Sequence, residues 1–185
     1  MAAHERVGSS AIVINTSYSD AVIPWLKSAG KAYPDFGSGN INHLIPRIKL
    51  AVAEQYHIED FWNIDITYAT AHFHDVVISK EGHTEGVDQL ICIKYNGKVI
   101  KADLKKIFAD CKIVMPVDAK RNMMNASSNF EIIKAVLGAV RNGKKVKLHC
   151  PGMFGEVGGY PVIVDGTKEN IVSYIETNDF TLDQM

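Results

Sequence analysis

Runs of alternating apolar and polar residues along the chain predict several short strands. The segment 64–68 alternates with a period of two, which is typical of a strand with one buried face. Two further alternating runs lie within 90–100, on either side of Asn96-Gly97, a dipeptide that favours a tight hairpin turn. Apolar segments rich in β-branched residues predict the remaining strands at 11–14, 145–148, 160–164 and 171–175.

Apolar residues at helical spacing predict helices between these strands. Every third or fourth residue is apolar over 44–56, which would give a helix one continuous apolar face. Shorter helices are predicted over 21–27 and over 104–109, and Asp103 occupies the N-cap position of the second. The mixture of strands and helices therefore predicts an α+β fold in which an antiparallel sheet is packed with helices.

One more helix is predicted in the second half of the chain from its end signals. Ser128 and Glu131 have the spacing of a capping box and precede an apolar periodic run, so we expect the helix to begin at Ser128. Gly143 follows the run and is a typical helix C-terminal residue, so we expect the helix to end there.

Length and composition indicate one domain over residues 1–185. Hydrophobic residues make up 46% of the chain and charged residues 22%, as in ordinary globular proteins. The net charge is -1, and the opposite charges are interleaved, which argues against a nucleic-acid partner. No apolar run is long enough to cross a membrane, and the three cysteines are far apart, so we expect a cytoplasmic protein with free thiols.

Two glycine-rich segments lack the features of a phosphate-binding loop. Residues 152–159 are rich in glycine but do not follow a strand and open a helix with the spacing of a dinucleotide site. Gly37-Ser38-Gly39 precedes a helix but lacks the third glycine and the downstream acidic residue. Both segments are therefore interpreted as chain turns.

His72-Phe73-His74-Asp75 is the stretch with the clearest potential for chemistry. Histidine titrates near neutral pH and can exchange a proton with a substrate oxygen. Two histidines two residues apart also suit a metal ion, and surface histidines without a role are the third interpretation. The strand at 64–68 either continues through both histidines or ends near Thr70, which would place them on its terminal loop.

Two polar residues close to predicted element ends are candidates for substrate contacts. Arg47 can grip a carboxylate with two parallel hydrogen bonds, although most arginines are solvated surface residues. Asn15 ends a predicted strand and can bind a substrate or shape the following turn.

The order of these motifs resembles the C-terminal, substrate-binding half of the lactate/malate dehydrogenase superfamily. The strand ending at Asn15 resembles the family's strand that runs into an asparagine-proline turn. Gly37-Ser38-Gly39-Asn40 and the helix with Arg47 resemble its Gly-Ser-Gly loop and arginine-bearing helix, and the stretch 71–75 lies where the family has its catalytic histidine loop. The segments 154–164 and 169–175 are similar to its closing strands.

The resemblance implies hydride transfer between a nicotinamide cofactor, NAD(P), and a small 2-hydroxy or 2-keto acid. The proton-transferring histidine would be His72 or His74, and the substrate carboxylate would pair with Arg47. Asn15 and Asn42 would be further substrate contacts. A positioned acid–base group of this kind contributes about two to four orders of magnitude in rate.

The sequence also departs from this family. Asn42 and His43 occupy the neighbourhood in which the family carries an aspartate that orients its histidine. No nucleotide-binding half precedes Ser10, so the resemblance implies that a Rossmann-type partner chain or domain would supply the cofactor site.

Two other functions remain open at this point. A domain of a nicotinamide- and metal-dependent glycosidase is the first, because the histidines at 72 and 74 would suit a divalent metal. A non-catalytic oligomerisation or ligand-binding module is the second. A homo-oligomer is expected in every case, since the dehydrogenase family dimerises through its domain interfaces.

Overall fold

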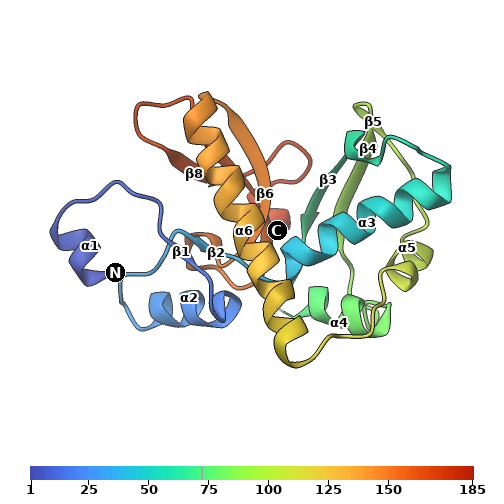
Figure 1. The fold of residues 1–185 in the computed structure, drawn as a ribbon, viewed down its shortest axis with the longest axis horizontal. Coiled ribbons are helices and arrows are strands. Elements are labelled where there is room, and N and C mark those ends of the chain that lie inside the picture. Colours follow the sequence, from blue (N-terminus) through green and yellow to red (C-terminus); the bar gives the residue numbers. More distant parts are fainter. Residues whose placement is uncertain (72) are drawn as a thin grey trace.

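The computed structural model describes residues 1–71 and 73–185, with Asn40 described by its backbone alone. Helices pack against small sheets, of which the described residues form three (Figure 1). The helices of the described residues are α1 Ala2–Arg6, α2 Ser19–Ser28, α3 Asn40–Tyr56, α4 His74–Glu81, α5 Leu104–Asp110 and α6 Asp118–Asn142. The strands are β1 Ile14–Asn15, β2 Phe36–Gly37, β3 Ile64–Ala69, β4 Leu90–Tyr95, β5 Lys98–Val99, β6 Lys145–Pro151, β7 Gly159–Asp165 and β8 Val172–Ile175.

The described strands pair mostly in the antiparallel sense. β3, β4 and β5 form one antiparallel sheet, and β6, β7 and β8 form another. The short strands β1 and β2 pair in parallel, with α2 as the connection between them. The predicted α+β class with antiparallel sheets and packed helices is therefore confirmed.

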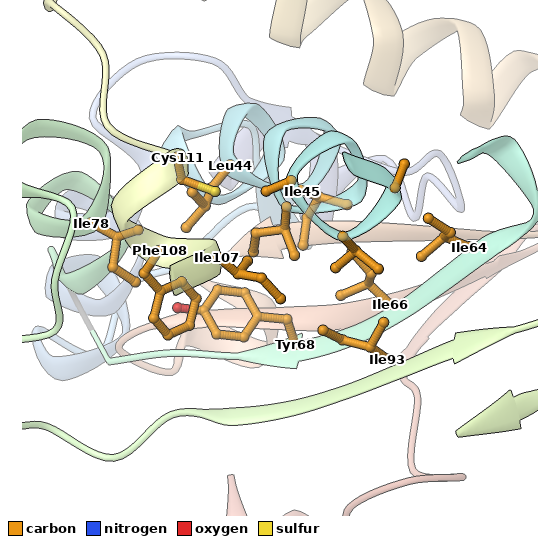
Figure 2. Close-up of a cluster of buried hydrophobic side chains, with 14 of the residues drawn as sticks. Leu44, Ile45, Ile64, Ile66, Tyr68, Ile78, Ile93, Ile107, Phe108 and Cys111 are labelled. Atoms are coloured by element: carbon orange, nitrogen blue, oxygen red, sulfur yellow. The ribbon is translucent and has the colours of Figure 1, made fainter. Parts of the chain in front are cut away.

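The first hydrophobic core lies between α3 and the sheet of β3, β4 and β5. Ile64, Ile66 and Tyr68 alternate along β3 and point toward α3, where Leu44 and Ile45 face them (Figure 2). Side chains of α4 and α5 close one end of this core. All five named side chains are buried, because the period-two face of the strand and the apolar face of the helix match.

The second hydrophobic core lies between α6 and the sheet of β6, β7 and β8. Ile132 and Ala139 of α6 are buried together with Leu148, Val162 and Val164 of the sheet. Figure 1 shows α6 lying across β6. One long helix thus covers the apolar face of each three-stranded sheet.

A pair of backbone hydrogen bonds joins the two sheets. The Thr70 N–H donates to the Gly159 carbonyl at 3.0 Å, and the Gly159 N–H donates to the Thr70 carbonyl at 2.9 Å. A Cβ atom on Gly159 would lie 2.6 Å from Cδ1 of Ile41, so the first turn of α3 packs directly against this junction. The two cores are therefore held in one arrangement at the point where β3 ends and β7 begins.

Several local predictions are confirmed. The hairpin forms at Asn96-Gly97, where both residues have the positive φ angles, 49° and 76°, that such a turn requires. Asp103 caps α5 by accepting a hydrogen bond from the Lys106 backbone N–H. Gly143 ends α6 in the left-handed conformation.

Two predicted boundaries are wrong. The first strand is limited to β1, because the segment before Ile14 has no strand pairing. α6 begins at Asp118, ten residues before Ser128, so the spacing of Ser128 and Glu131 does not mark a helix start. Ser128 instead lies buried inside the helix, where its hydroxyl bonds to groups of the α3 start rather than to its own helix.

None of the helices in the described part of the chain is long and apolar enough to span a membrane.

Candidate functional site

A polar pocket of about 470 Å³ opens where three helices begin beside a fourth. The amino-terminal ends of α2, α3 and α4 meet there beside the first half of α6. The lining residues are Thr16, Ser17, Tyr18, Ser19, Asp20, Ala21, Ser38, Gly39, His43, Phe73, Val76, Arg121, Asn122, Asn125, Ser128 and Asn129. Helix amino termini carry a partial positive charge and free N–H groups, so their convergence favours a negatively charged ligand group.

The parallel pair of β1 and β2 brings two loops to this pocket. Asn15 lies beside Gly37 in the register, so both strands end at the same edge and continue into the lining segments. A Cβ atom on Gly37 would lie 2.0 Å from Cβ of Ser19, which explains why glycine occupies this position. The hydroxyl of Ser19 donates to the Ser38 carbonyl and fixes the loop against α2.

Asn15 shapes the turn that leads into the pocket. Its Oδ1 accepts a hydrogen bond from the Ser17 backbone N–H at 3.0 Å, the pattern of an Asx turn. This contact corresponds to the turn-forming interpretation of Asn15, and it holds Ser17 at the pocket wall.

Asn42 connects α3 to α6 at the edge of the pocket. Its Nδ2 donates to the hydroxyl of Ser128 at 3.1 Å, and that hydroxyl donates in turn to the Gly39 carbonyl at 3.4 Å. The hydroxyl of Ser38 donates to Oδ1 of Asn129 in a parallel contact. The Gly-Ser-Gly loop is therefore attached to α6 by two side-chain bridges.

Arg121 supplies the cation of the pocket. One of its guanidinium nitrogens, Nη1, lies 3.0 Å from the sulfur of Met115. Among the described residues it forms no ion pair with a carboxylate, and the lining contains a single carboxylate, that of Asp20. A guanidinium without a protein counter-ion at the wall of a polar pocket suits an anionic ligand.

His43 lies in the pocket as a neutral imidazole. Burial lowers the pKa of His43 to about 4, and the positive charges of Arg47 and Arg121 act in the same direction. An anion bound beside Arg121 would offset that positive charge, so it would raise the pKa of His43 and improve its ability to accept a proton.

A buried carboxyl group lies behind the pocket, in the first turn of α4. Asp75 is 8% exposed, and its Oδ1 accepts a hydrogen bond from the Val76 backbone N–H at 2.7 Å. Burial raises the pKa of Asp75 to about 7; the nearby Asp20 adds to this, while the Val76 N–H and the charge of Arg47 oppose it. Asp75 therefore exchanges its proton near neutral pH.

Arg47 is engaged by protein groups and does not line the pocket. Its guanidinium donates to the carbonyl of His43 at 3.2 Å, to the carbonyl of Cys111 at 2.7 Å and to the hydroxyl of Ser79 at 2.7 Å. These contacts connect α3 to α4 and to the end of α5. Arg47 thus supports the wall that carries His43 from behind.

His74, one of the two histidines of the 71–75 stretch, lies beyond the end of β3. β3 ends at Ala69 and Thr70 makes a single bridge, so the strand does not continue to His74. His74 is the first residue of α4, and its Nδ1 is buried with no hydrogen-bond partner. His74 does not line the pocket, and His72 lies outside the described residues.

No group of three or more histidine, cysteine, aspartate or glutamate side chains in the described part of the chain is arranged to hold a metal ion.

Several lining residues were not predicted from the sequence. The first half of α6 carries four of them, Arg121, Asn122, Asn125 and Asn129. The capping-box interpretation places most of this segment outside the helix. The sequence marks His43 only as a departure from the family pattern. The polar residues of α6 between Asp118 and Asn129 were an available signal, since they precede the apolar run on the same helix.

Comparison of the chain with family models, with curated protein sequences and with solved structures gives no match.

Proposed function

We propose that the chain is the substrate-binding domain of a 2-hydroxyacid dehydrogenase-like oxidoreductase and that a small carboxylic acid binds in the polar pocket. The observation that carries the proposal is Arg121, a cation without a protein counter-ion at a pocket where helix amino termini converge. The Gly-Ser-Gly loop and the turn after Asn15, two of the motifs behind the family resemblance, form part of the same wall.

The pocket offers a separate partner for each group of a 2-hydroxy acid. The carboxylate would pair with Arg121, and charge-assisted bonds of this kind contribute about 1.5–3 kcal/mol each. The hydroxyl would lie toward His43 and Asp20; the neutral imidazole of His43 would accept the hydroxyl proton while the hydride on the same carbon passes to the nicotinamide held by the partner chain or domain. The proposal therefore assigns the carboxylate contact to Arg121 instead of Arg47. It assigns the acid–base role to His43 instead of His72 or His74.

The pocket does not fit a nicotinamide dinucleotide. The turn between β1 and α2 is Thr16-Ser17-Tyr18, which has no glycine to let a pyrophosphate approach the backbone. The cofactor would therefore bind to a Rossmann-type partner chain or domain, and the residues of this chain would act on the acid alone.

Calorimetric titration of the purified chain with lactate, malate and pyruvate tests the carboxylate site. We expect binding to the wild-type chain and at least a tenfold weaker affinity for Arg121→Gln, because the variant loses the charge-assisted bond. Lys120→Gln is the matched control, since it removes the same charge from an exposed neighbour on α6 outside the pocket. Propane-1,2-diol, which keeps the lactate hydroxyl but lacks the carboxylate, should not bind.

Two results would contradict the proposal. Equal affinity of the wild-type chain and Arg121→Gln for the acids would remove the carboxylate site. The dehydrogenase function would be contradicted if the chain captures no dinucleotide-binding chain and no captured mixture oxidises NADH in an acid-dependent way. Only acid binding would then remain.

A further inference from the structure

The polar pocket is much larger than a small acid bound to Arg121. It measures about 470 Å³, which lies within the range of roughly 300–1,000 Å³ for sites that hold drug-sized ligands. Arg121 and Asn129 lie eight positions apart on α6, so the pocket wall between them runs roughly 12 Å along the helix. A three-carbon acid such as lactate would fill only the part of this space beside Arg121.

Amide side chains continue from Arg121 along the same face of α6. Arg121, Asn125 and Asn129 follow one another at intervals of four residues, which places them in a row along the helix. Asn122 lines the pocket beside this row. Asparagine is a weaker helix former than alanine, so the exposed amides at 122 and 125 bring no gain in stability to α6 itself. A ligand in the pocket would give these amides a role.

Four side chains of the lining keep their hydrogen-bonding groups open to a ligand. These four open side chains are Thr16, Ser17, Asn122 and Asn125, which are all exposed. None of them forms a side-chain hydrogen bond with another described residue. Hydroxyl and amide groups both donate and accept hydrogen bonds. A ligand whose own groups do the same, such as a chain of hydroxyls, is therefore complementary to them.

The rest of the lining favours a neutral polar chain. Arg121 is the only lysine or arginine among the described lining residues, so a second acidic group would have no cation to pair with. Ala21 and Val76 are the only aliphatic residues among them, so an alkyl chain would find little apolar surface. The exposed aromatic rings of Tyr18 and Phe73 can pack against the C–H groups of a polyol.

We propose that the ligand of the polar pocket is a sugar acid, an aldonic acid of the gluconate type. Its carboxylate binds Arg121, and its hydroxyl chain runs along α6 toward Asn129. The hydroxyls beyond the second carbon form hydrogen bonds with the four open side chains. This inference rests on the proposed function, because it keeps the carboxylate at Arg121 and the 2-hydroxyl near His43.

Calorimetric titration of the full chain with three acids tests the inference. Gluconate carries the carboxylate, the 2-hydroxyl and the further hydroxyls. 2-Hydroxyhexanoate has the same chain length without the further hydroxyls, and lactate lacks both the length and the further hydroxyls. We expect gluconate to bind at least about tenfold more tightly than either of the other two, because several neutral hydrogen bonds add to the carboxylate contact.

Variants of α6 test the assignment of the amides. In the double variant Asn122→Ala/Asn125→Ala, the ratio of gluconate to lactate affinity should fall at least about threefold, because two of the four open side chains are lost. Ser127→Ala is the matched control, since it removes an exposed polar side chain of α6 outside the pocket and should keep the ratio. Alanine favours a helix, and far-UV circular dichroism checks that both variants are folded.

The outcomes separate this inference from the proposed function. The sugar-acid assignment would be overturned, and the carboxylate site would stay, if gluconate binds no more tightly than lactate or 2-hydroxyhexanoate. An unchanged affinity ratio in the double variant would have the same meaning. If none of the acids binds, or if Arg121→Gln does not weaken gluconate binding, the proposed function itself is contradicted and the inference falls with it.

Discussion

At the scale of single residues, burial decides what each charged group can do. Arg47 and Arg121 carry the same guanidinium, but Arg47 donates to two carbonyls and a hydroxyl inside the protein. Arg121 lies at a pocket wall without a carboxylate partner among the described residues. Only the second is available to a ligand, and nothing in the residue types alone distinguishes the two.

Asp75 gives the clearest pH-dependent prediction at this scale. Its pKa is about 7 in the folded chain and near 3.8 when exposed, so the folded state binds more protons between these values. The free energy of unfolding therefore falls as the pH rises from about 4 to 7. Between pH 5 and pH 8 the ionisation of Asp75 should lower the free energy of unfolding of the wild-type chain by roughly 2–3 kcal/mol. This decrease should be absent in Asp75→Asn.

Urea unfolding of both proteins at pH 5 and pH 8 measures this difference. His43 acts in the opposite sense, because its lowered pKa makes stability rise with pH between about 4 and 6.5, but it is present in both proteins. Asp183→Asn is the control, since Asp183 is exposed. A pH dependence in Asp75→Asn as steep as in the wild-type chain would contradict the assignment of a raised pKa to Asp75.

At the scale of elements, α6 shows how a helix start is decided by tertiary contacts. Ser128 has the residue type and spacing of a cap, yet it lies inside α6 because its hydroxyl is engaged by Asn42 and Gly39 of the neighbouring α3 start. The ten residues before it continue the helix and bring Arg121 to the pocket. The local capping signal therefore does not set the start of α6, because the Ser128 hydroxyl bonds to groups from another part of the fold.

Two glycines near the end of α6 give opposite predictions. A Cβ atom on Gly166 would lie 2.2 Å from the Ala139 carbonyl oxygen, where the loop after β7 crosses the helix backbone. Gly166→Ala should therefore lower the free energy of unfolding by about 1–3 kcal/mol. Gly138 lies inside α6 with open space at its Cβ position, so Gly138→Ala should raise it by about 0.5–1 kcal/mol.

Thermal and urea unfolding of the two alanine variants measures these changes against the wild-type chain. Because both substitutions add one methyl group at the same end of the molecule, each serves as the control for the other. Equal effects of the two would show that the close approach at Gly166 does not constrain the fold.

At the scale of the whole molecule, polar side chains fill the junction between the two cores. The Thr67 hydroxyl, on β3, donates to Asp179 from the C-terminal segment, and Asp179 also pairs with Lys94 of β4. His149 of β6 accepts a hydrogen bond from the Tyr68 backbone N–H at 3.3 Å. Burial lowers the pKa of His149 to about 3, so it makes this contact as a neutral imidazole.

Removing one donor at this junction should weaken the whole fold. Thr67 is 1% exposed, and Thr67→Val leaves a carboxylate oxygen of the partly buried Asp179 with one partner fewer. We expect the free energy of unfolding to fall by about 1–2 kcal/mol in urea titrations. Thr177→Val, at an exposed position in the same C-terminal segment as Asp179, should change it by less than about 0.5 kcal/mol. A wild-type midpoint for Thr67→Val would contradict a structural role of this contact.

The sequence by itself determined the elements whose signals are local. The period-two face of β3, the hairpin at Asn96-Gly97, the cap at Asp103 and the helix end at Gly143 all depend on residues a few positions apart. Each of these signals is a direct consequence of backbone geometry, so it holds before any long-range contact forms. The α+β class follows from the same patterns.

Only the tertiary structure decided which side chains share a site. Ser38, His43 and Arg121 belong to three separate segments and meet because the starts of α2, α3 and α4 converge beside α6 at one pocket. The same packing turned Arg47 inward and left five large apolar side chains of α6 exposed, Met123, Phe130, Ile133, Leu137 and Val140. Neither outcome is encoded within a window of a few residues, because each depends on how two cores and their helices are placed against each other.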